Sequence, residues 1–119
     1  MVKPLRGECE VVLAGTTYTA RLGIGELEDL ENTTGLGTLE LLKSFGTNAK
    51  IRNAVAVLSQ ALTENDKKVG HARARRIVEK AGFGESVTAC IAALSAVLIE
   101  PTEGNADAAE VEATKAPSA

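Results

Sequence analysis

The stretch "ECEVVLAGTTYTARL", residues 8–22, decides the fold of the first part of this sequence. Apolar and polar side chains alternate on both sides of "AGT", which is the period of two that half-buried β-strands show. One face of the two strands consists of Cys9, Val11, Leu13, Tyr18, Ala20 and Leu22. Gly15 can adopt the positive φ of a tight turn. We therefore expect a β-hairpin over residues 8–22, with a cover for its apolar face, because two strands alone are barely stable.

Helical spacing of apolar residues follows the hairpin from residue 24 to residue 99 and predicts about five short helices. The first begins at Ile24, the second contains Leu39, and the third begins near Ile51 and ends at "TENDKK". The fourth is expected from Lys67 to Ala81, before Gly82 at its end. The fifth is expected to start at Ser86 and to end before Pro101. Its predicted inward residues are Val87, Ile91, Leu94, Val97 and Leu98.

These elements predict an α+β fold, an N-terminal antiparallel β-hairpin packed on a small bundle of about five short helices. The length of 119 residues suits one domain. We assign residues 1–7 to an N-terminal arm and residues 8–100 to a single α+β domain, with the hairpin at 8–22 and helices over 24–99. Residues 101–119 are small, polar and aperiodic, which predicts a disordered tail.

Composition, charge and cysteine content limit the classes of protein to which this sequence can belong. Hydrophobic residues make up 45% and aromatic residues 3%, so the core must be aliphatic. The net charge of -3 argues against a nucleic-acid protein, which needs a basic surface. Cys9 and Cys90 lie far apart in sequence, which favours a reduced cytosolic interior. The N-terminal sequence lacks a secretory signal, and no apolar run approaches the ~20 residues that a membrane span needs.

The glycine-rich segment "GIGELEDLENTTGLG", residues 23–37, resembles a ligand-binding loop only superficially. Glu28 stands where a dinucleotide-binding loop needs its third glycine, and the chain contains no G-K-[ST]. Asp29, Glu31 and Thr33 have the alternate spacing of a calcium loop, but the turn glycine comes one place late and the final bidentate glutamate is absent. We interpret the glycines as helix boundaries and expect no metal and no cofactor.

Other candidate sites are weak. His71 lies in a basic and exposed stretch, and the two cysteines fall on apolar faces, where thiols are inert. These observations predict a protein that is not an enzyme. Arg73, Arg75 and Arg76 form a possible basic contact face, for which a solvated helix surface is the first interpretation, a protein partner the second and nucleic acid the last.

A leucine-rich helix follows Gly35 and offers a possible contact surface. We expect Leu39, Leu42 and Phe45 to enter the core. Leu36 and Leu41 are then left over, and we predict that they bind a partner.

The order of these motifs resembles phage tail assembly chaperones of the gene transfer agent type. The residues that carry the resemblance are Arg6-Gly7-Glu8 before the first strand, Gly15 and Tyr18 at the turn, Leu27, Leu30 and Glu31, and the leucine-rich segment 35–42. Two later helical segments, "IRNAVAVLSQAL" and "HARARRIVEKAGFGESVTACIAALSAVL", lie where the family has its helical second half. The resemblance covers residues 6–99.

The resemblance implies a non-enzymatic role. Such a chaperone binds the tape measure protein and keeps it soluble while the tail tube polymerises around it. The implied location is the bacterial host cytoplasm, with no chaperone retained in the mature particle. The major tail protein is a second candidate partner, and an exposed hairpin edge could pair with a second copy as a homo-oligomer. No membrane partner is expected. The alternatives are a small helical nucleic-acid-binding regulator, which would use the Arg73–Arg76 face, and a structural tail-completion protein.

Overall fold

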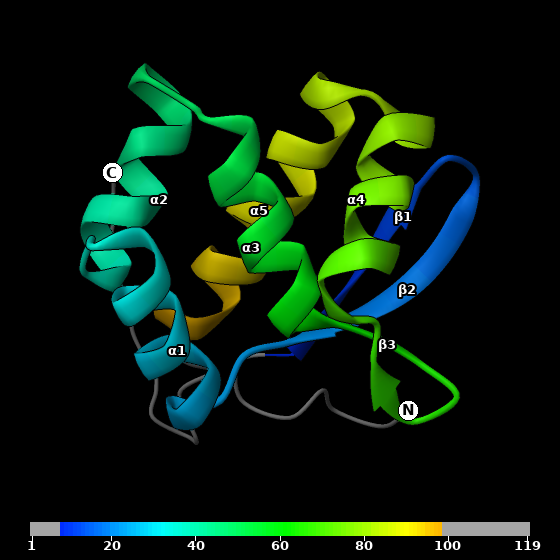
Figure 1. Ribbon diagram of the computed structural model, residues 1–119, viewed down its shortest axis with the longest axis horizontal. Coiled ribbons are helices and arrows are strands. Elements are labelled where there is room, and N and C mark those ends of the chain that lie inside the picture. Colours follow the sequence, from blue (N-terminus) through cyan, green and yellow to red (C-terminus); the bar gives the residue numbers. More distant parts are fainter. Residues whose placement is uncertain (1–7, 99–119) are drawn as a thin grey trace, which may run out of the picture.

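The computed structural model describes residues 8–98, and it is an α+β fold, as the sequence predicts (Figure 1). The strands are β1 (Glu8–Leu13), β2 (Thr16–Arg21), β3 (Leu62–Glu64) and β4 (Lys67–Lys68). The helices are α1 (Ile24–Thr34), α2 (Thr38–Thr47), α3 (Ile51–Ala61), α4 (Gly70–Ala81) and α5 (Phe83–Leu98). The predicted arm, 1–7, and the predicted tail, 101–119, lie outside the described residues.

The predicted N-terminal hairpin is confirmed. β1 and β2 are antiparallel, with Val11 opposite Tyr18 and both side chains buried. The turn between them places two residues at positive φ, Ala14 at 53° and Gly15 at 81°. A two-residue hairpin turn of this kind matches the twist of the strands. The glycine was expected there, whereas the alanine in the left-handed region was not.

A second hairpin, formed by β3 and β4, was not predicted. β3 pairs with β2 through Ala20 opposite Leu62, so the sheet has the order β1-β2-β3-β4. Asn65 and Asp66 form its turn, with φ values of 53° and 65°. Both residue types tolerate the left-handed region. Lys67 therefore belongs to a strand, and the fourth helix begins at Gly70 instead of Lys67.

Two glycine–glutamate pairs define the starts of α1 and α2. The backbone N–H of Gly23 donates to Oε1 of Glu26 at 2.8 Å, and that of Gly37 donates to Oε1 of Glu40 at 3.0 Å. The negative charge of a glutamate in the first turn also stabilises the helix, because the helix N-terminus carries a partial positive charge. Gly23, Gly35 and Gly37 are helix boundaries, as predicted, and Gly35 ends α1 with a φ of 76°. Gly25 lies inside the first turn of α1.

The acidic residues that suggested a calcium loop lie on α1. Asp29 and Glu31 are both exposed and helical. Two positions along an α-helix are separated by about 200° around its axis, so these carboxylates point to different sides. Within residues 8–98, no group of three His, Cys, Asp or Glu side chains is placed to hold a metal ion.

Helix α3 lies at the centre of the molecule (Figure 1). It packs against α1, α4, α5 and β2, and its middle section from Ala54 to Leu58 is buried. Ile51, which was expected in the core, is 57% exposed because it stands at the first turn of the helix, outside the packed layers. α5 covers the apolar face of β1, the cover that the hairpin was expected to need.

The inward face of α5 differs from the predicted one. Its buried residues are Ser86, Ala89, Cys90, Ala93 and Leu94. Of the predicted set only Leu94 is buried; Val87, Ile91 and Val97 are half-buried and Leu98 is exposed. Most of the buried side chains are small, and α5 packs against both β1 and α2. The helix also begins at Phe83, three residues before the predicted start.

Candidate functional site

The two leucines that were predicted to bind a partner lie in different environments. Leu41 is 1% exposed and belongs to the core, so the prediction that it lies at the surface is wrong. α2 begins at Thr38, and from that start Leu41 and Phe45 face inward one turn apart. Leu36 is half-buried and lines a hollow of about 370 Å³ between α1, α2 and α3.

Leu39 takes the surface position that was assigned to Leu41. Its side chain is 52% exposed, although the sequence placed it in the core. Leu42 lies three residues further along α2, on the same side of the helix, and is half-buried. α2 therefore presents Leu39 to solvent in place of the predicted Leu41, so the helix is rotated relative to the orientation expected from the sequence.

α2 and α5 pack against each other, and both helices carry apolar side chains that are exposed or half-buried. We define the α2–α5 face by the residues Leu39, Leu42, Val87, Ile91 and Leu98. The three α5 members recur at spacings of four and seven residues, which places them on one side of that helix. After Glu85, α5 carries no charged residue up to its end at Leu98. The α2–α5 face can therefore contact an apolar partner without desolvating a charge of α5.

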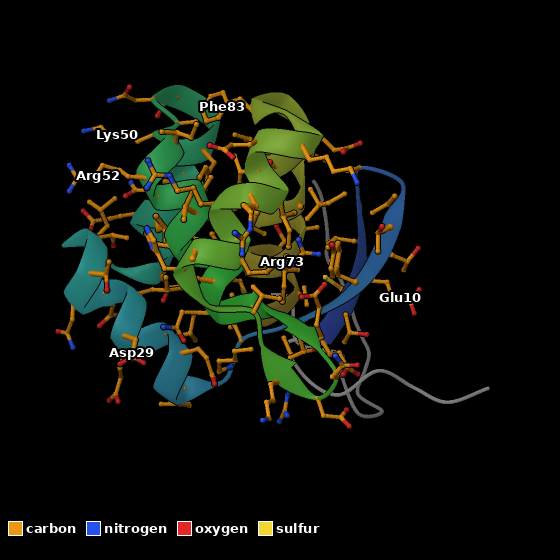
Figure 2. The ribbon with its side chains drawn as sticks, turned by 45° about the vertical axis from the view of Figure 1, so that its right-hand side comes forward. Glu10, Asp29, Lys50, Arg52, Arg73 and Phe83 are labelled. Atoms are coloured by element: carbon orange, nitrogen blue, oxygen red, sulfur yellow. The ribbon has the colours of Figure 1, made fainter. Side chains whose placement is uncertain are left out.

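The three arginines of α4 do not form one face. Arg73 and Arg76 lie against the first hairpin, whereas Arg75 points toward α3. Arg73 makes a bidentate ion pair, with Nε 3.0 Å and Nη2 2.9 Å from the two carboxylate oxygens of Glu64, and its position is visible in Figure 2. These hydrogen bonds lower the pKa of Glu64. The single basic face Arg73–Arg76 is therefore split, and one of its charges is already paired.

A groove runs along the outward side of α3. One hollow of about 480 Å³ lies between α3 and α4, and another of about 450 Å³ lies between α3, α1 and the start of α4. Both are lined by Arg52 and His71, so they adjoin at these residues, and we call them together the α3 groove. His71 is exposed there, as the sequence predicts.

The thiols are placed as the sequence predicts. Cys90 is fully buried and donates to the carbonyl oxygen of Ala54 at 3.6 Å, and burial raises the pKa of its thiol strongly. Cys9 is half-buried, and its pKa is raised first by desolvation and then by the neighbouring Glu8. A raised pKa suppresses the reactive thiolate, so neither cysteine has the environment of a nucleophile.

Comparison with known proteins decides the family. Residues 6–100 match the family described as "Phage tail tube protein, GTA-gp10". The chain belongs to this GTA-gp10 family. The match covers nearly the same residues as the resemblance found in the sequence, and it supports a tail-related protein with other tail proteins as its partners. Searches among curated proteins and solved structures give no significant match.

Two features of this GTA-gp10 family member were missed in the sequence. The α3 groove is formed by residues of α1, α3, β4 and α4, and no local sequence motif predicts that these elements come together. The α2–α5 face depends on the rotation of α2, for which the Gly37–Glu40 start was an available signal. Within residues 8–98, no helix combines the length and the apolar character needed to cross a bilayer.

Proposed function

We propose that this protein is a tail assembly chaperone that binds the tape measure protein and keeps it soluble while the tail is built. The proposal includes a non-enzymatic mode of action in the bacterial host cytoplasm and the absence of the protein from the mature particle. Membership of a phage tail protein family supports the tail context. The resemblance of residues 6–99 to tail assembly chaperones supports the more specific role.

The observation that carries the proposal is the α2–α5 face. Leu39 is 52% and Leu98 is 43% exposed, and the other members of this face are half-buried aliphatic side chains. A helical partner can dock its apolar stripe on such a face. Burying a leucine that is already half-exposed gains roughly 1 kcal/mol, so a few such contacts give the modest affinity that a displaceable chaperone needs.

Co-expression with a tape measure fragment tests this role. The double variant Leu39→Asp, Leu98→Asp introduces two charges into the α2–α5 face, and we expect the fragment to become insoluble and to stop co-purifying. Ile24→Asp is the matched control, because Ile24 is 75% exposed at the first position of α1, where a negative charge is tolerated. Co-purification of the double variant at the wild-type yield would overturn the assignment of this face.

The family description favours a second candidate function, a structural component of the tail. Such a protein would remain in the particle, whereas a chaperone would leave it. Mass spectrometry of purified particles distinguishes the two, since a structural component appears in a fixed ratio to the major tail protein. The major tail protein is a candidate partner in both cases.

The nucleic-acid-binding alternative is disfavoured by the arrangement of α4. Arg73 is paired with Glu64, and Arg75 lies on another side of the helix from Arg76. Binding through phosphate contacts weakens steeply with salt, whereas an apolar contact does not. An affinity for the tape measure fragment that hardly changes between low and physiological salt is therefore the expected result.

A further inference from the structure

The α3 groove carries a concentration of positive charge. Lys50, Arg52, Lys68 and Arg75 line it or the hollow that adjoins it at Arg52. Glu79 is the only acidic side chain among the lining residues of these hollows. Lys50 and Arg52 project outward from the same side of the helices in Figure 2.

Arg52 and Arg75 are available for a charged ligand. Both side chains are exposed, and within residues 8–98 neither forms an ion pair. Lys68 differs from them, because it is already bound to Glu26 at 2.6 Å. The hollow that contains Arg52 and Lys68 is also lined by the small or polar residues Asn53, Ala56 and Ser59 of α3. The hollow that contains Arg52 and Arg75 is lined by the aliphatic Val55 and Val78. A narrow segment with negative charges and small side chains fits this surface.

The sequence that follows α5 has this chemistry. Residues 99–119 contain Glu100, Glu103, Asp107, Glu110 and Glu112 against the single cation Lys115. Alanines separate the acidic residues in "ADAAEVEA", 106–113. The segment is also long enough, since 21 residues can extend over roughly 70 Å and the described part of the protein measures 40 Å along its longest axis.

We propose that the acidic segment 99–119 docks in the α3 groove of its own chain, with its carboxylates facing Arg52 and Arg75. Tethering supports this occupant, because a linked segment has a high effective concentration at the site and needs little intrinsic affinity. The contact is electrostatic and lies on α3 and α4, away from the α2–α5 face. It is therefore independent of the proposed chaperone role.

Amide chemical shifts of the full-length ¹⁵N-labelled chain test the docking. The tail-neutral variant Glu103→Gln, Asp107→Asn, Glu110→Gln, Glu112→Gln keeps the length of the segment and removes its charge. We expect shift changes at amides that line the groove, such as Asn53, Gln60 and His71. At about 1 M salt, where the Debye length is near 3 Å, the wild-type spectrum should approach that of the variant.

Charge reversal identifies the basic partners. Arg52→Glu, Arg75→Glu should move the amides of residues 103–112 to the positions that they take in the wild-type chain at about 1 M salt, because each lost pair weakens docking by roughly two- to fivefold. Adding Asp107→Lys, Glu110→Lys to the reversed groove should restore the docked shifts of groove amides that carry no substitution, such as Gln60 and His71. Lys43→Glu is the control, since Lys43 is exposed on α2 and does not line the groove.

Three results would overturn the proposal. The first is that the chemical shifts of the tail amides do not change when Arg52 and Arg75 are replaced by glutamate. The second is an equal response of the tail amides to Lys43→Glu, which would show that they sense only the overall electrostatic field of the protein and no specific contact with the groove. The third is a loss of the docked shifts on tenfold dilution, which would assign the segment to the groove of another copy.

Discussion

The carboxylate of Glu26 lies 2.6 Å from the ammonium group of Lys68 and so joins the start of α1 to the second hairpin. Its other oxygen accepts the N–H of Gly23. The hydrogen bond from Lys68 is the largest cause that lowers the pKa of Glu26 below its usual 4.5. The side chain of Glu26 thus connects α1 to the second hairpin and also caps the start of α1. Substitutions of Glu26 can separate the ion pair from the cap.

Glu26→Gln keeps an oxygen for the Gly23 N–H and removes the ion pair, so we expect a loss of about 0.5 kcal/mol in the free energy of unfolding at pH 7. Glu26→Ala removes both contacts and should cost about 1.5 kcal/mol. Glu40→Ala is the matched control, because Glu40 caps α2 and forms no ion pair within residues 8–98. Urea denaturation measures the free energy of unfolding of all three variants. Equal losses for Glu26→Gln and Glu26→Ala would contradict the separate contribution of the cap at Gly23.

The same pair predicts a pH dependence. Because the pKa of Glu26 is lower in the folded state than in the unfolded state, its contribution to stability is complete above the unfolded value near 4.5 and is lost as the pH falls through the folded value. The stability difference between wild type and Glu26→Gln should therefore shrink below pH 4. Urea midpoints between pH 3 and pH 7 test this, and a constant difference across that range would refute it.

Ala14 occupies a position that favours another residue. Its φ of 53° lies in the left-handed region, and it precedes Gly15 in a two-residue turn. Asn-Gly is the preferred sequence for such a turn, so Ala14→Asn should raise the free energy of unfolding by about 0.5–1 kcal/mol. The backbone N–H of Ala14, which donates to Glu85 at 2.8 Å, is unaffected by this change. Gly15→Ala is the control and should destabilise; a destabilised Ala14→Asn would exclude this account.

The predictable part of the fold follows from strong local patterns. Alternation over residues 8–22 identified the buried side chains of the first hairpin because each strand has one covered face. The second hairpin has strands of three and two residues, too short for a periodic signal, and Leu62 also continues the helical spacing of α3. Only the Asn65-Asp66 pair indicated a turn.

The candidate site was harder to predict, since it depends on rotation. A shift of one residue turns a helical side chain by about 100°, which is enough to exchange Leu39 and Leu41 between surface and core. The start of α2 at Thr38 decides between them, through the cap of Gly37 by Glu40. On α5, the prediction took the largest hydrophobic residues as the inward face, whereas Ala89, Ala93 and Cys90 are buried and Ile91 is half-buried.

Truncation of the leucines tests this exchange directly. Leu41→Ala should lower the free energy of unfolding by about 2–5 kcal/mol, because it leaves a cavity in the core. Leu39→Ala, with a side chain that is 52% exposed, should change it by no more than about 0.5–1 kcal/mol. Thermal or urea denaturation of both variants decides the rotation of α2. A larger loss for Leu39→Ala would restore the assignment made from the sequence.

Thiol labelling reports on the packing of α5. Cys90 is buried, with a pKa raised by desolvation, so iodoacetamide should not modify it in the native protein. Cys9 is half-buried and should react slowly. In urea above the unfolding midpoint both should react at similar rates. Cys9→Ser isolates Cys90, whose rate then follows the opening of the contact between α5 and α3 at the Ala54 carbonyl. Native labelling of Cys90 as fast as that of Cys9 would place α5 outside the core.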